Sequence, residues 1–170
     1  VRLVETQSGA DHTEVMERFA RRRVAALRKL DLAGYVLKNN SPSCGMERVK
    51  IYEESGMPAR KGVGLFAAAL AEALPDLPVE EEGRLTDPVL RENFIERVFA
   101  YRRLKDLFSG RWTRGQVVAF HTRHKLQLMA HSPAAYRSLG RQVGELSTQP
   151  RAEFARTYRC LLYTSPSPRD

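Results

Sequence analysis

Cysteine is scarce in this chain, which has only two among 170 residues. So few thiols exclude the disulfide framework of a small secreted domain. Long apolar runs are also missing, because no window approaches the run of about eighteen apolar residues that a membrane span needs. No secretory leader opens the chain, but it begins at Val1, so we expect a fragment whose true start lies upstream. A globular protein without a membrane segment is the class that fits.

The last eleven residues, CLLYTSPSPRD at 160–170, have no hydrophobic periodicity. A transposon mosaic-end adapter used in sequencing-library preparation encodes the same residues when it is read in one frame. We therefore expect an artefactual tail and leave it out of the fold prediction. Cys160 then drops out of the count, and one remaining cysteine cannot form an internal disulfide. A reducing, cytoplasmic location is the expectation that follows.

The charge balance is strongly basic, with 28 Lys and Arg against 20 Asp and Glu and a net charge of +8. An excess of this size favours anionic partners through long-range attraction, with nucleic acid first and a membrane surface second. Charge alone does not decide between them, since many basic proteins bind neither.

The first half of the chain alternates helix and strand signals. Asp11 followed by Glu14 has capping-box spacing, which predicts a helix over 12–30. Strand signals follow at 34–38 and 48–52, and loops are predicted at 39–45 and 53–62. A helix signal covers 63–74, and a short strand signal covers 77–82. This order predicts an α/β layer structure, a truncated Rossmann-like fold whose first strands lie upstream.

From Leu85 onward every signal is helical. Asp87 can cap a helix that has Pro88 at its first position, and Thr113 with Gln116 forms a second capping-box pair. A Ser-Pro step at 132 and 133 ends one helix and starts the next. The predicted helices cover 88–108, 113–131 and 133–146.

Two domains are therefore predicted. Residues 1–84 form the α/β part, residues 85–159 form an all-α helical domain, and 160–170 are the artefactual tail. The fold class is α/β followed by all-α.

Two groups of motifs resemble known families. GYVLKNNSPSCG, RVKIY and KGVGLFA are similar to the C-terminal half of the thiouracil desulfidase family. LPVEEEGRLTDPVLRENFIERVFAYRRL and VVAFHTRHKLQLMAHSPAAYRSLGR resemble the YbgA-like domain of unknown function that is fused to it in a subset of proteins. The fused type is implied to remove sulfur from 4-thiouridine in tRNA.

The resemblance implies an iron-sulfur cofactor. Family members hold a four-iron, four-sulfur cluster on three cysteines, which leaves one iron open to take the sulfur of a thiolated uracil. The cysteine of SPSCG is one of the three, and this role carries over to Cys44. The other two belong to a CLLG-like and a CPE-like motif that this sequence does not contain. The intact parent is thus expected to be a C–S bond hydrolase, and this fragment alone to be inactive.

Four residues at the first strand and its loop are candidates for the chemistry. Cys44 is either a cluster ligand or a small inert residue, because one thiol without partners does not define a cluster. Its place on a loop after a strand, where α/β folds collect ligands, favours the ligand. Ser41 and Ser43 could hydrogen-bond cluster sulfides or uracil carbonyls, or simply cap the turn. Lys38 could stabilise negative charge on the substrate, although a solvated strand end is favoured.

Basic residues predict RNA contacts in both parts of the chain. Arg60 and Lys61 precede a helix whose free backbone amides could bind a tRNA phosphate, although close packing of that helix explains the glycines beside it equally well. In the helical part an RNA-facing stripe is predicted. Phe120 and Tyr136 could stack on bases, but core packing is favoured for both. The members of the stripe are Arg114, His121, Arg123, His124, Lys125 and, at the end, His131.

Two other motifs have competing interpretations. The histidines of HTRHKLQLMAH could hold zinc, but His121 and His131 lie about 15 Å apart along a helix, so a structural role competes. The run of Glu80, Glu81 and Glu82 suggests a general base or a metal site, but a solvated linker is favoured.

The sequence therefore predicts a fragment of a desulfidase for thiolated uracil, with 4-thiouridine in tRNA as the expected substrate. The alternative is a non-enzymatic, basic RNA-binding or regulatory module carried by the helical domain.

Overall fold

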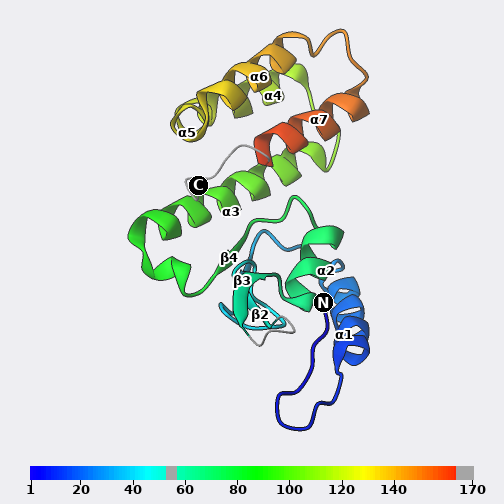
Figure 1. Cartoon of the computed structure of the whole chain (residues 1–170). Helices are drawn as coiled ribbons and strands as arrows, with labels where there is room; N and C mark the ends of the chain where they lie inside the picture. The colour runs from blue at the N-terminus through cyan, green and yellow to red at the C-terminus, as the bar shows by residue number, and fades with distance from the viewer. Residues whose placement is uncertain (53–56, 164–170) are drawn as a thin grey trace. The chain divides into compact units, whose positions relative to one another are not determined.

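The computed structural model describes residues 1–52 and 57–163, with the backbone alone at 131 and 160–163 (Figure 1). The chain separates into two compact units, Val1–Arg91 and Glu92–Asp170. The first unit combines helices with small sheets, and the described part of the second unit contains helices without strands, which confirms the fold class of α/β followed by all-α. In the described residues, no helix is both long enough and apolar enough to cross a membrane.

The first unit packs two helices beside two small sheets. Its elements are α1 (Thr13–Leu27), β1 (Tyr35–Leu37), β2 (Val49–Tyr52), β3 (Pro58–Gly62), α2 (Leu65–Ala73), β4 (Val79–Glu81) and a 3-10 turn, η1 (Arg84–Thr86). β1 pairs in parallel with β4, and β2 pairs antiparallel with β3. Helices α1 and α2 lie side by side (Figure 1), and both contribute buried apolar residues, including Val24 and Leu70.

Two details of this unit differ from the prediction. Helix α1 begins at Thr13, with His12 at the N-cap and no side-chain cap, so the predicted capping box is wrong. Asp11 instead accepts hydrogen bonds from the amide and hydroxyl of Thr13. The segment 53–62 was predicted as a loop, but its described part contains β3, a strand whose PARKG sequence has no apolar alternation. It forms because its backbone pairs with β2.

The turn that carries Cys44 is docked on the first turn of α2. The carbonyl of Ser43 accepts from the amides of Phe66 at 2.8 Å and Ala67 at 3.2 Å. The carbonyl of Gly45 accepts from the Gly64 amide at 2.8 Å. Carbonyls of one loop therefore satisfy the amides that the start of a helix leaves unpaired. The predicted phosphate site on free amides of this helix is wrong for that reason.

The second unit is built from helices around an aromatic core. They are α3 (Pro88–Phe108), which begins in the first unit, then α4 (Arg114–Arg123), α5 (Lys125–His131), α6 (Pro133–Gly144) and α7 (Arg151–Tyr163). The buried core includes Leu104, Trp112, Leu139, Phe154 and Tyr158, and the rings make tilted and stacked contacts with one another.

Helix boundaries in this unit follow the predicted caps, with one exception. Thr113 and Gln116 form the predicted capping box, and Ser132 caps α6 with Pro133 at the first helical position. The single helix predicted over 113–131 is instead broken at His124, whose φ of −95° and ψ of 5° are not helical. The apolar spacing continues across the break, so periodicity did not reveal it.

Substituting Gly64 with alanine should loosen the docked turn. An added Cβ would overlap the carbonyl group of Ser43 and lie 2.6 Å from the Cys44 nitrogen, and these are backbone atoms. We expect a loss of about 1–3 kcal/mol in the stability of this unit. Hydrogen exchange followed by mass spectrometry should show faster exchange at the start of α2. The control is Gly110→Ala, where nothing lies within 4 Å; equal protection in both variants would contradict the docking.

Truncating the core of the second unit should destabilise it strongly. Leu139 is fully buried at 0% exposure, so Leu139→Ala should lower the free energy of unfolding by about 2–5 kcal/mol. Trp112 is the single tryptophan and lies in this core, so its fluorescence reports the transition in urea. The matched control, Leu126→Ala, changes a side chain that is 78% exposed and should stay within about 0.5 kcal/mol. Equal losses in the two variants would contradict the described core.

Candidate functional site

Cys44 is a free, half-buried thiol in the loop between β1 and β2. Its sulfur lies 3.3 Å from the hydroxyl oxygen of Ser43. The Ser41 hydroxyl accepts from the amides of Ser43 and Cys44 at 3.3 Å and lies 2.9 Å from the Ser43 hydroxyl. Ser41 therefore caps the turn, which is one of its two predicted roles. Ser43 is the hydroxyl that contacts the sulfur.

Two of three consecutive carboxylates, those of Glu81 and Glu82, hold the loop that carries Cys44. The Glu82 carboxylate accepts from the Asn39 amide at 2.7 Å, near the start of the loop. The Glu81 carboxylate accepts from the Met46 amide at 2.7 Å, just beyond Cys44. Glu80 accepts from Arg84 Nε at 3.0 Å. We call this set, Glu80, Glu81 and Glu82, the acidic clamp.

The acidic clamp corrects the prediction of a solvated linker. Glu80 is 3% exposed and Glu81 is 7% exposed. Parallel pairing sets Leu37 opposite Glu81, so the carboxylates meet the loop as it leaves β1. Loop amides and Arg84 replace the water that burial removes, as buried charges require. The sequence offered one signal that was missed: a polar loop after β1 contains backbone donors that need acceptors.

Lys38 forms an ion pair with Glu82 of the acidic clamp. Its Nζ lies 2.7 Å from the Glu82 carboxylate, although the lysine side chain is 73% exposed. The hydrogen bond between them raises the pKa of Lys38 and lowers the pKa of Glu82. Lys38 therefore remains charged and fixed at the start of the loop, which is more than the solvated strand end favoured from sequence.

Iron-sulfur clusters require several thiolates that converge on one point. Cys44 brings one. Within residues 1–52 and 57–163, no group of three His, Cys, Asp or Glu side chains comes together to hold a metal ion. The described residues therefore do not complete a cluster site, and they provide no zinc site from the histidines either.

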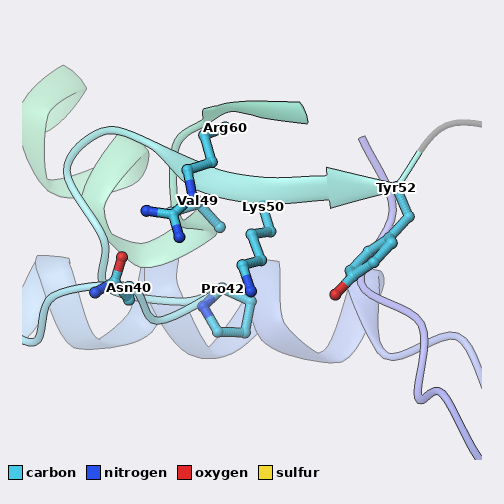
Figure 2. Close-up of a pocket in the computed structure, with 6 residues that line it drawn as sticks. All are labelled: Asn40, Pro42, Val49, Lys50, Tyr52 and Arg60. Atoms are coloured by element: carbon cyan, nitrogen blue, oxygen red, sulfur yellow. The ribbon is translucent and has the colours of Figure 1, made fainter. Parts of the chain in front are cut away.

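A pocket of about 390 Å³ adjoins the Cys44 loop (Figure 2). Asn40 and Pro42 of the loop form one wall. The strands β2 and β3 supply Val49, Lys50, Tyr52 and Arg60. Arg60 is thus placed beside the loop, as a residue of a pocket rather than of a helix N-terminus. Lys50 and Tyr52 were missed, although the alternation of RVKIY sets them on one face of a strand.

The residues of the predicted RNA-facing stripe in the second unit differ in how far they are buried. His124 is 4% exposed, stacks on Phe120, and its Nδ1 lies 2.9 Å from the Phe120 carbonyl oxygen. His121 stacks on Tyr136, and its Nδ1 lies 3.1 Å from the Tyr158 hydroxyl. Burial lowers the pKa of both histidines.

His121 and His124 therefore pair with aromatic residues of the core, and burial favours the neutral form of each. Arg114, Arg123 and Lys125 are exposed. The side chain of His131 lies outside the described residues.

Two segments of the chain match known family models. Residues 1–82 match the family described as 2-thiouracil desulfurase. Residues 125–168 match a protein of unknown function (DUF1722), a range that includes most of the predicted tail. No curated protein and no solved structure matches the chain. The resemblance predicted from the motifs is confirmed: the chain joins a segment similar to 2-thiouracil desulfurase to a segment similar to a domain of unknown function.

Proposed function

We propose that residues 1–82 form part of a desulfidase that removes sulfur from thiolated uracil, with 4-thiouridine in tRNA as the substrate. The observation that carries this proposal is the family match over the segment in which Cys44 is held on a docked turn. The overall reaction is hydrolysis, in which a thiocarbonyl and water give a carbonyl and hydrogen sulfide. The single free thiol outside the predicted tail supports a reducing, cytoplasmic location.

Cys44 is proposed as one of three cysteine ligands of a four-iron, four-sulfur cluster in the intact protein. Such a cluster would supply a Lewis-acidic iron for the substrate sulfur. Such a cluster needs two further cysteine ligands, and the described residues do not supply them. The 170-residue chain alone is proposed to be inactive for the same reason.

The chain's own residues would prepare Cys44 for this role. The Ser43 hydroxyl, 3.3 Å from the sulfur, can donate to a thiolate and stabilise its charge. Ser41 fixes the turn through two backbone amides. Lys38 and Glu82 fix the start of the loop, so we propose that Lys38 acts by position rather than by direct contact with substrate.

The second unit is proposed to contact tRNA through its exposed cations Arg114, Arg123 and Lys125. Phosphate contacts need positive groups that water can reach, and these three side chains are exposed. The net charge of +8 supports the same partner. An RNA-binding module without enzymatic activity is the competing function.

Replacing Cys44 should abolish turnover in the intact protein. An anaerobically prepared full-length protein with Cys44→Ala should lose more than about 100-fold in activity on thiouracil and thiolated tRNA, together with its iron-sulfur absorption. Ser43→Ala should keep the cluster and lose about 10- to 100-fold, as expected for a partner of a ligand. The control is Thr122→Ala, at an exposed position of α4. An intact cluster and unchanged turnover in Cys44→Ala would contradict the assignment.

Neutralising the exposed cations of the second unit should weaken tRNA binding. The triple variant Arg114→Gln, Arg123→Gln, Lys125→Gln of the 170-residue chain should bind less tightly. The slope of log affinity against log salt should fall by about one for each lost phosphate contact. Fluorescence anisotropy across a salt series measures both quantities.

A matched control removes three exposed cations of α1 and its C-terminal end, as Arg18→Gln, Arg22→Gln, Lys29→Gln. Equal losses in the two triple variants would show that only net charge matters and would contradict a defined surface. Tight tRNA binding by an intact protein that shows no turnover would favour the non-enzymatic function.

A further inference from the structure

Cys44 lies next to a glycine whose backbone has little stiffness of its own. A Cβ at Gly45 would lie 2.5 Å from the Val49 side chain and 3.0 Å from the Ser41 carbonyl oxygen, so the turn has no room for a larger residue. Glycine, however, populates more backbone conformations than any other residue. The direction of the thiol therefore has to be fixed by hydrogen bonds that hold the peptide groups around Gly45.

Three successive amides of the turn have acceptors, and the third acceptor comes from outside the turn. The amides of Cys44 and Gly45 both donate to Ser41, one to its hydroxyl at 3.3 Å and the other to its carbonyl at 2.8 Å. The Met46 amide instead donates to the Glu81 carboxylate at 2.7 Å, at the end of β4. Glu81 therefore ties the amide side of the turn to the sheet.

The peptide group between Gly45 and Met46 is held at both of its ends. Its carbonyl accepts from the Gly64 amide at 2.8 Å, and its amide donates to Glu81. Opposite ends of one planar group are thus attached to the N-cap of α2 and to the last residue of β4. Removing the acceptor of Glu81 leaves the group with one attachment, about which it can rotate together with Gly45.

The side chain of Glu81 is buried where an apolar residue would suit the fold. Glu81 is 7% exposed, and its register partner in β1 is Leu37, which is 3% exposed. A carboxylate loses its hydration in such a place, and buried charged groups are weak evidence for stability because apolar residues of similar volume often replace them without loss. What the carboxylate gains is the Met46 amide, in a stronger bond than a neutral acceptor makes. This contact explains a glutamate at the position, and burial alone does not.

The chain beyond Met46 has a conformation that also needs contacts on both sides. Arg48 has a φ of +62°, in the left-handed region that residues with a Cβ adopt rarely. Such a backbone persists where the surrounding structure determines it. β2 begins at Val49 on one side of Arg48, and Glu81 holds Met46 on the other side. The same contact therefore fixes how the chain leaves the turn and enters β2.

We infer that Glu81 is a positioning residue for the Cys44 thiol, acting through the Met46 amide. The carboxylate fixes the peptide group that follows Gly45, and this group limits the directions open to the residue before it. As a statement about catalysis the inference rests on the proposed function, because a cluster ligand has to meet other thiolates at one point. Residues that orient a ligand in this way change metal affinity or activity by about 10- to 100-fold when they are lost.

The test compares variants of the 170-residue chain in two measurements that require no cluster. Glu81→Leu keeps most of the side-chain volume and removes the acceptor. Hydrogen exchange at the Met46 amide should become at least about 10-fold faster, since a bond to a charged acceptor is lost. Alkylation of Cys44 by iodoacetamide, followed by peptide-resolved mass spectrometry, should speed up by a similar factor because the half-buried thiol is released.

Glu81→Gln keeps an acceptor of nearly the same length and shape, so it tests the inference even where Glu81→Leu does not fold. A neutral carbonyl accepts more weakly than a carboxylate, so exchange at Met46 should rise about 3-fold, with Cys44 alkylation within about 3-fold of the unaltered chain. Unchanged exchange at Met46 in this variant would overturn the role of the carboxylate.

The matched control is Val24→Ala, which opens a cavity in α1 of the same unit, at a residue that is 4% exposed. It lowers the stability of the unit and keeps every acceptor of the turn. Exchange along α1 and α2 reports the overall stability of the unit in each variant. If Met46 exchange and Cys44 alkylation rise as much in this control as in Glu81→Leu, the role of Glu81 is structural and the inference fails.

The intact protein, prepared anaerobically, separates the inference from the proposed function. Glu81→Leu should lower kcat about 10- to 100-fold with KM within about 3-fold, and Glu81→Gln should restore most of kcat. An unaltered intact protein without turnover would contradict the proposed function and leave the exchange and alkylation results standing. Equal turnover in the unaltered protein and in Glu81→Leu would overturn the positioning role and leave the proposed function standing.

Discussion

The hydrogen bonds between the Cys44 turn and the start of α2 are the constraint on which the first unit depends. A helix start has unpaired amides and a tight turn has unpaired carbonyls, and each costs free energy when it is buried without a partner. Here these groups pair with each other, because the carbonyls of Ser43 and Gly45 accept from backbone amides of α2 and of Gly64. Gly64 is required by the same contact, since any side chain would meet backbone atoms. The position of the thiol is therefore a property of the helix as much as of the loop.

The acidic clamp completes this arrangement through a second set of hydrogen bonds. Glu81 and Glu82 accept from amides that flank Cys44 along the chain, and Glu80 binds Arg84. Carboxylates accept such bonds more strongly than neutral groups do, and burial removes the competing water. Asn40 and Pro42 of the same loop line the pocket in Figure 2, so this pocket and the thiol share one support.

The second unit shows how packing redirects residues that sequence reasoning assigned to a surface. His121 and His124 occur among cations, so their types and spacing favoured an RNA-facing stripe. The aromatic core supplies better partners, because Tyr136 and Phe120 stack on their rings and Tyr158 accepts or donates a hydrogen bond. The helix break falls at His124, and Arg114, Arg123 and Lys125 remain exposed.

The sequence by itself determined the class of fold, most helix and strand positions, the caps at Thr113 and Ser132, and the relationship to thiouracil desulfurases. Those features depend on periodicity, cap residues and long motifs, which are local along the chain. Only the tertiary structure decided that β3 is a strand, that Glu80 and Glu81 are buried, and that Lys50, Tyr52 and Arg60 share a pocket with Asn40. Each of these depends on a partner from another segment of the chain: β2 for β3, the loop amides for the glutamates, and the opposite strand for the cations. Backbone donors and acceptors set the pairing between segments. Every residue type carries nearly the same backbone groups, so the sequence does not show which segments pair.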